Sequence, residues 1–190
     1  MKQAIKRSVA AVILAALAIA SGFGIQQLYF AIQNKNYPTV YSEYVEKYSE
    51  KYNVPKDVIY AVIKVESNFS YNAKSYKNAN GLMQIMPGTY EWLCGREGID
   101  PEAHKIDDPD INIMIGTCYL AYLYNEFEVW DTVFAAYNAG HGIVRKWLAD
   151  EQYGKDGHLT NIPYPETASY VKKVSDARQI YIKILQRKDG

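Results

Sequence analysis

Apolar side chains recur every three to four positions along most of the chain beyond residue 40, and this period constrains the fold more than any other feature. Such spacing places side chains on one face of an α-helix, whereas a strand alternates at every second residue. No alternating run of any length interrupts the helical pattern. The sequence therefore predicts a mainly α domain, with helices over 41–51, 55–67, 89–94, 111–127, 130–139, 144–149 and 167–186.

The first 36 residues have a different composition. Three basic residues near the start precede an uncharged run over 8–25, and the next charge is Lys35. As a helix this run is about 27 Å long, and its continuation through Ile32 reaches the roughly 30 Å of a bilayer core. Residues 1–36 are therefore predicted to be a signal-anchor or signal peptide, with residues 37–190 as the folded domain.

We favour an uncleaved transmembrane anchor over a cleaved signal peptide. The alternative stays open because Ala18 and Ala20 have the small-x-small form that precedes a cleavage site. The basic residues ahead of the run, Lys2, Lys6 and Arg7, orient the remaining chain outside the cytoplasm. The expected location is the cell membrane, single-pass with the domain extracytoplasmic, or secreted if the segment is cleaved.

Composition narrows the class of ligand. Lys plus Arg and Asp plus Glu both number 21, and there is no long basic run, so a nucleic-acid partner is disfavoured. The 18 tyrosines against 5 phenylalanines favour wet clefts of the kind that suit sugars. Cys94 and Cys118 have no neighbouring ligands at metal spacing, so no metal site is predicted. Whether these two cysteines form a disulfide stays open.

An acid lies where the pattern of the 55–67 helix calls for a hydrocarbon. At about 100° per residue the helix has a broad apolar arc and a polar side. The arc holds Val58, Ile59, Ala61, Val62, Ile63 and Val65, and the polar side holds Asp57, Tyr60 and Lys64. Glu66 projects from inside the arc, in the last turn of the helix.

Burial and the negative end of the helix dipole both raise the pKa of a carboxyl in that position. An acid that keeps its proton near neutral pH can protonate the leaving oxygen of a glycosidic bond. Alternatively, Glu66 turns out to solvent or pairs with a lysine. Periodicity alone does not decide between these interpretations.

Four separated motifs accompany Glu66: ES at 66–67 with Ser75, GLMQIMPGT at 81–89, AAYNAG at 135–140 and IPYPETASYV at 162–171. In this order they closely resemble the soluble lytic transglycosylases with a lysozyme-like catalytic domain, over residues 41–184. The resemblance implies a goose-type-lysozyme-like compact helical domain. It also implies a peptidoglycan lytic transglycosylase that binds glycan strands and cleaves the bond between N-acetylmuramic acid and N-acetylglucosamine.

The resemblance also implies roles for single residues. Glu66 is the sole catalytic acid and base, and Ser75 contacts the sugar near the reacting centre. The substrate-binding residues implied with it are Gln84, Met86, Tyr137, Asn138, Glu166 and Tyr170. The hydroxyl of Tyr137 is expected near the catalytic carboxyl, and Met86 has a competing interpretation as a core residue.

The chain departs from the family pattern at two positions. Ala168 stands where the family usually has the arginine of an ETR motif, so a guanidinium is missing. Asn78 stands where a glycine is common, but asparagine tolerates a left-handed backbone and can preserve the turn.

One carboxyl suffices if the muramyl 6-hydroxyl is the nucleophile and a 1,6-anhydro ring forms without water, metal or cofactor. An ordinary glycosidase needs two carboxyl groups. The acids at 100, 107, 108 and 110 are better explained as loop and helix-capping residues. A hydrolytic muramidase with an unrecognised second acid, and a non-catalytic peptidoglycan-binding protein, stay open as alternatives.

Overall fold

The computed structural model describes the backbone of residues 2–188 and the side chains of residues 17–188. The chain divides into two compact units, one that ends at Pro38 and one that begins at Thr39.

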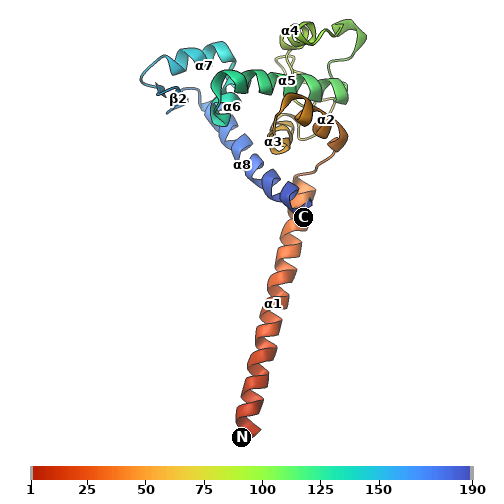
Figure 1. Ribbon diagram of the computed structural model, residues 1–190, viewed down its shortest axis with the longest axis vertical. Coiled ribbons are helices and arrows are strands. Elements are labelled where there is room, and N and C mark those ends of the chain that lie inside the picture. The colour runs from red at the N-terminus through yellow and green to blue at the C-terminus, as the bar shows by residue number, and fades with distance from the viewer. Residues whose placement is uncertain (1, 189–190) are drawn as a thin grey trace. The chain divides into compact units, whose positions relative to one another are not determined.

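The first unit consists of one continuous helix, α1 (Lys2–Asn36) (Figure 1). Its described part presents large apolar side chains to the surface, among them Leu17, Ile19, Phe23, Ile25 and Leu28. In the described part of the chain, no helical segment has the length and hydropathy that a membrane crossing requires. The predicted membrane run begins at Ser8, and residues 8–16 lie outside the described side chains.

The second unit confirms the prediction of a mainly helical domain. Its α-helices are α2 (Ser42–Tyr52), α3 (Lys56–Ser67), α4 (Pro87–Glu97), α5 (Pro109–Phe127), α6 (Trp130–Ala139), α7 (His141–Leu148) and α8 (Pro165–Lys188). A single 3-10 turn, η1 (Pro101–Ala103), precedes α5. Three of these helices begin two residues earlier than predicted, because a proline with its φ already set for a helix occupies the first turn.

The segment over 151–165, between the last two predicted helices, contains a short hairpin. Strands β1 (Gly154–Lys155) and β2 (His158–Leu159) pair antiparallel, with Gly154 opposite Leu159. Two residues per strand are too few to produce a recognisable alternation in the sequence.

Helix α5 runs through the core, and residues 111–120 are all buried. It packs against α2 and α6, while α3 and α6 pack against α8 (Figure 1). The sequence pattern misplaced one residue of α3: Tyr60, predicted on the polar side, is 2% exposed. Its ring stacks on that of Tyr181 with centroids 5.3 Å apart, so α8 covers a face that the helical wheel assigned to solvent.

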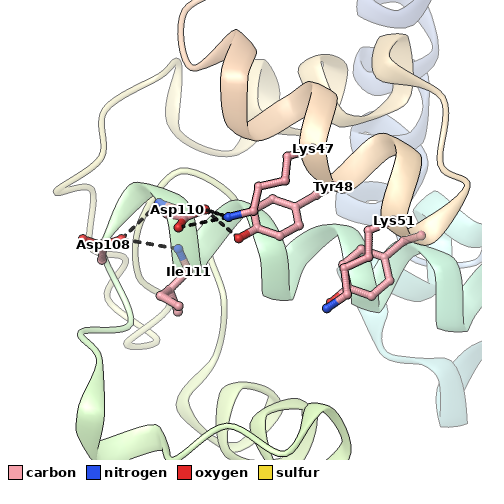
Figure 2. A network of polar contacts seen from close by, with 7 residues as sticks. Lys47, Tyr48, Lys51, Asp108, Asp110 and Ile111 are labelled. Atoms are coloured by element: carbon pink, nitrogen blue, oxygen red, sulfur yellow. Dashed lines mark hydrogen bonds and ion pairs between the residues drawn. The ribbon is translucent and has the colours of Figure 1, made fainter.

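Polar contacts tie α2 to the start of α5 (Figure 2). The carboxylate of Asp108 caps α5 by accepting from the backbone N–H groups of Asp110 and Ile111. Asp110 accepts from the Tyr48 hydroxyl at 2.6 Å and from the Lys47 ammonium at 3.3 Å. The capping interpretation of Asp108 is thus confirmed, and Asp100 likewise caps η1.

Cys94 and Cys118 are both buried and are not linked to each other. Loss of hydration raises the pKa of each thiol, in the case of Cys118 to about 11. They therefore behave as small apolar side chains.

Candidate active site

Glu66 is the next-to-last residue of α3, which ends where Asn68 adopts a left-handed conformation. Its carboxylate Oε1 accepts a hydrogen bond of 2.7 Å from the hydroxyl of Tyr170 on α8. Loss of hydration raises the pKa of Glu66 to about 7, although the Tyr170 bond favours the charged form and opposes this shift. A substantial fraction of Glu66 therefore carries a proton at neutral pH.

The carboxyl of Glu66 opens into a cleft with a volume of about 450 Å³. Every residue that the sequence predicted for the site lines this cleft, except Tyr170. The lining includes Glu66, Ser75, Gln84, Met86, Tyr137, Asn138 and Glu166. Tyr170 is buried and meets the site through its bond to Glu66.

Ser75 organises the loop that forms one wall of the cleft. Its hydroxyl oxygen accepts from the backbone N–H of Ala79 at 3.0 Å, and its own N–H donates to the Ala79 carbonyl. Between them, Asn78 has a φ of 69°, the left-handed conformation expected for an asparagine in place of glycine. Asn78 thus adopts a backbone conformation that glycine adopts readily.

Gln84 and Met86 both line the cleft. The amide nitrogen of Gln84 donates to the carbonyls of Ala73 and Gly81, so this side chain also links the two ends of the loop. Met86 is 43% exposed, which excludes the core interpretation and leaves its thioether free to contact a ligand.

Helix α6 contributes Tyr137 and Asn138 to the lining of the cleft. The hydroxyl of Tyr137 donates to the Met83 carbonyl at 2.8 Å. The residue that donates to the Glu66 carboxylate is Tyr170, although burial and then the charge of Glu66 do raise the pKa of Tyr137. Asn138 accepts from the Thr167 hydroxyl at 2.8 Å, a bond that joins α6 to α8 beside the cleft.

Asn112 supports the site from within the core, and the sequence analysis missed it. It is fully buried on α5, accepts from the Met83 N–H at 2.8 Å, and donates to the carbonyls of Asn80 and Ile106. Gly81 has a φ of 78° and leaves the space that Asn112 fills. A Cβ added to Gly81 would lie 2.3 Å from the side-chain amide nitrogen of Asn112. No periodicity or motif signals this role of Asn112.

Two exposed tyrosines stand at the edges of the cleft and were also missed. Tyr76 is 91% exposed and Tyr164 is 50% exposed, and both line the cleft. Exposed rings at a cleft edge are surfaces on which sugars stack. Beyond Met86 the cleft continues into a recess of about 230 Å³, which Thr89, Tyr119 and Gly140 help to form.

Charge in the cleft is sparse. Among the described residues that line it, Glu166 is the only carboxylate besides Glu66, and it is exposed. Within the described residues, no group of His, Cys, Asp and Glu side chains is arranged to hold a metal ion. The arrangement can supply one proton from a poorly hydrated acid to a ligand that contacts polar and aromatic walls.

The sequence and the fold were both compared with known proteins. The family model described as Transglycosylase SLT domain matches residues 43–159. The soluble lytic murein transglycosylase of Escherichia coli strain K12 is 36% identical over 146 residues, which are 74% of this chain and 22% of that protein. The membrane-bound lytic murein transglycosylase C of Actinobacillus pleuropneumoniae serotype 5b is 32% identical over 168 residues, 76% of this chain and 46% of that protein.

Solved structures agree with these matches. The 70 kDa soluble lytic transglycosylase of Escherichia coli has a TM-score of 0.73 at 34% identity, over 80% of this chain and 26% of that one. An inactive mutant of the lytic transglycosylase Slt from Pseudomonas aeruginosa has a TM-score of 0.71 at 32% identity, over 79% of this chain and 25% of that one. The chain thus spans 22% to 46% of the length of these relatives. By the match over most of its folded unit, the chain belongs to the transglycosylase SLT domain family.

Proposed function

We propose that residues 37–190 form a peptidoglycan lytic transglycosylase domain that cleaves between N-acetylmuramic acid and N-acetylglucosamine and leaves 1,6-anhydromuramic acid. The observation that carries this proposal is the Glu66 carboxyl, which opens into the cleft with a pKa of about 7. Family membership and the names of the relatives give the substrate class.

Glu66 acts first as an acid and then as a base. Protonated, it gives its proton to the glycosidic oxygen as the bond to the leaving sugar breaks. The resulting carboxylate takes the proton of the muramyl 6-hydroxyl, whose oxygen closes the anhydro ring on the anomeric carbon, so no water is consumed. Tyr170 keeps the carboxylate oriented between the two steps through its 2.7 Å hydrogen bond.

Hydrolysis by two carboxyl groups is the second candidate, because Glu166 lines the same cleft. Its exposure disfavours a catalytic role, since a solvated carboxylate has no fixed orientation toward the substrate. A hydrolase would nevertheless need such a partner for Glu66.

Product analysis tests both candidates. Purified sacculi are digested with the wild type, Glu66→Gln and Glu166→Gln, and the products are analysed by mass spectrometry. We expect anhydromuramic ends from the wild type and Glu166→Gln, and none from Glu66→Gln. Reducing-end muramic acid that disappears in Glu166→Gln would establish hydrolysis instead. Intact strands after incubation with the wild type would favour a non-catalytic peptidoglycan-binding protein.

Residues 1–36 are assigned here to an uncleaved membrane anchor, with the catalytic domain outside the cytoplasm. Support comes from the uncharged run over 8–25, from the exposed apolar side chains of α1, and from a relative named as membrane-bound. The test is alkaline extraction of cell membranes combined with the intact mass of the recovered protein. Retention in the pellet at full mass is expected, whereas a soluble product shortened near Ala20 would identify a cleaved signal peptide.

A further inference from the structure

A second cavity, of about 350 Å³, lies beside the first turns of α6 and α8 and shares no lining residue with the Glu66 cleft. Its walls come from both helices and from the β2 strand with the loop that follows. The residues that matter to its chemistry are Asp131, Thr132, His158, Leu159, Ala168 and Val171.

The cavity combines an apolar floor with one carboxylate. Thr132 and Val171 are buried at its base, and Leu159 is half-buried. Asp131 is exposed, and its Oδ1 accepts from the Ser175 hydroxyl at 2.7 Å, which fixes the carboxylate on the wall. No other hydrogen bond to Asp131 is formed within the described residues, so its second oxygen can accept from a ligand. Such a site suits an aliphatic chain that ends in a cation.

Ala168 lines this cavity with a methyl group alone, which leaves room for a ligand beside α8. A longer side chain at this position would occupy the volume and bring its own cation to Asp131. Among the described residues, no lysine or arginine lines the cavity, so a cation that pairs with Asp131 there would come from a ligand.

The cavity lies within reach of a ligand in the Glu66 cleft. On α6, Thr132 lines the cavity and Asn138 lines the cleft. These two residues are about 9 Å apart along the helix axis. On α8, Thr167 lines the cleft and the next residue, Ala168, lines the cavity. In peptidoglycan, a diamino acid follows the muramic acid by about three peptide residues, which span at most roughly 10 Å.

We propose that this cavity binds the side-chain ammonium of the diamino acid in the peptide carried by a glycan strand bound in the Glu66 cleft. This inference rests on the proposed function, because the proposed function is what places the glycan strand in the Glu66 cleft. It adds recognition of the peptide to recognition of the sugar, with Asp131 as the residue that selects for positive charge.

The test compares two muropeptides that differ only in charge. One is a disaccharide tetrapeptide with a free side-chain amine, and the other is the same compound with this amine acetylated. Calorimetric titration into the full chain with Glu66→Gln measures binding without turnover. We expect acetylation to weaken binding by about tenfold, as for the loss of one charged hydrogen bond. Equal affinities would overturn the proposal.

Variants in the same Glu66→Gln background assign the effect to the cavity. Asp131→Asn keeps an acceptor for Ser175 but removes the charge, and Ala168→Arg fills the space; both should abolish the difference between the two muropeptides. Asp176→Asn is the matched control, because Asp176 is an exposed aspartate on α8 outside the cavity, and it should preserve the difference. A difference that survives Asp131→Asn would also overturn the proposal.

Cleavage of sacculi by the wild type separates this inference from the proposed function. If the wild type cleaves strands while acetylation has no effect on binding, the cavity assignment fails and the function stands. If binding depends on the amine but no strand is cleaved, the cavity assignment stands and the function fails.

Discussion

Two glutamates near the ends of consecutive helices each accept a hydrogen bond from a tyrosine hydroxyl, yet their pKa values shift in opposite directions. Glu66 lies near the end of α3 and accepts from the Tyr170 hydroxyl at 2.7 Å; Glu97 ends α4 and accepts from the Tyr52 hydroxyl at 2.6 Å. Loss of hydration raises the pKa of Glu66 to about 7. For Glu97, which loses less of its hydration, that effect is outweighed by hydrogen bonds from Lys51, Tyr52 and Cys118, and its pKa is lowered.

The two sites differ in how deeply the carboxyl is buried and in whether a cation pairs with it. The Lys51 ammonium lies 2.7 Å from the Glu97 carboxylate, whereas Glu66 has no ion pair within the described residues. A tyrosine hydroxyl orients a carboxylate in both places, but it does not by itself offset the loss of water. Deeper burial, together with the lack of an ion pair within the described residues, is therefore what equips Glu66 to be an acid at neutral pH.

The largest expected effect is on cleavage. Glu66→Gln removes the proton donor and should reduce strand cleavage by at least about 100-fold. Glu97→Gln is the matched control, and it should leave the rate within about twofold because Glu97 does not line the cleft. Release of soluble muropeptides from sacculi gives both rates. Comparable losses in the two variants would remove the functional distinction between the glutamates.

Stability should respond to pH in opposite directions at the two sites. A raised pKa means that the folded state holds the Glu66 proton more tightly, so the cost of ionising it is absent below about pH 4.5 and complete above about pH 7. Glu66→Gln should therefore increase the free energy of unfolding by up to about 3 kcal/mol at pH 8 and by little at pH 4. Glu97→Gln should lower the free energy of unfolding at pH 8, because it removes a carboxylate that the folded state stabilises. Urea denaturation at both pH values measures these differences.

Removal of the hydroxyl of Tyr170, but not that of Tyr52, should shift the pH profile of strand cleavage. The alkaline limb of the cleavage profile should lie near pH 7, where Glu66 loses its proton. Tyr170→Phe deletes a bond that favours the carboxylate, so this limb should move to higher pH by up to about one unit. Tyr52→Phe should leave it in place. A downward shift in Tyr170→Phe would contradict the assigned direction.

The smallest effect is expected from removal of the Lys51 ammonium beside Glu97. Lys51→Met should raise the pKa of Glu97 and lower the free energy of unfolding by at most about 1 kcal/mol, because the lysine is half exposed. NMR titration of the Glu97 carboxyl, with denaturation at neutral pH, measures both. An unchanged Glu97 pKa would show that Tyr52 alone holds the charge.

The sequence predicted the helices well because their apolar faces have a clear period, and it placed Glu66 in the last turn of α3. It failed at Tyr60, because whether a helix is covered on one face or two depends on a partner distant in the sequence, here α8. The two-residue strands of the hairpin were likewise too short to detect.

Within the site, the motifs identified the residues that line the cleft but not the contacts that support them. The bond from Tyr170 to Glu66 joins residues 104 positions apart, and Asn112 holds Met83 and Asn80 from a different helix. Neither contact has a local signature, because both depend on how the helices pack. The cavity beside Ala168 was visible in the sequence only as a missing arginine.

The two unlinked thiols, Cys94 and Cys118, determine how the domain responds to oxidants and reductants. Thiolates are the form that oxidants attack, and burial together with the nearby Glu97 charge keeps Cys118 protonated. No covalent crosslink between Cys94 and Cys118 holds the helices together. The folded domain should thus melt at the same temperature with or without dithiothreitol.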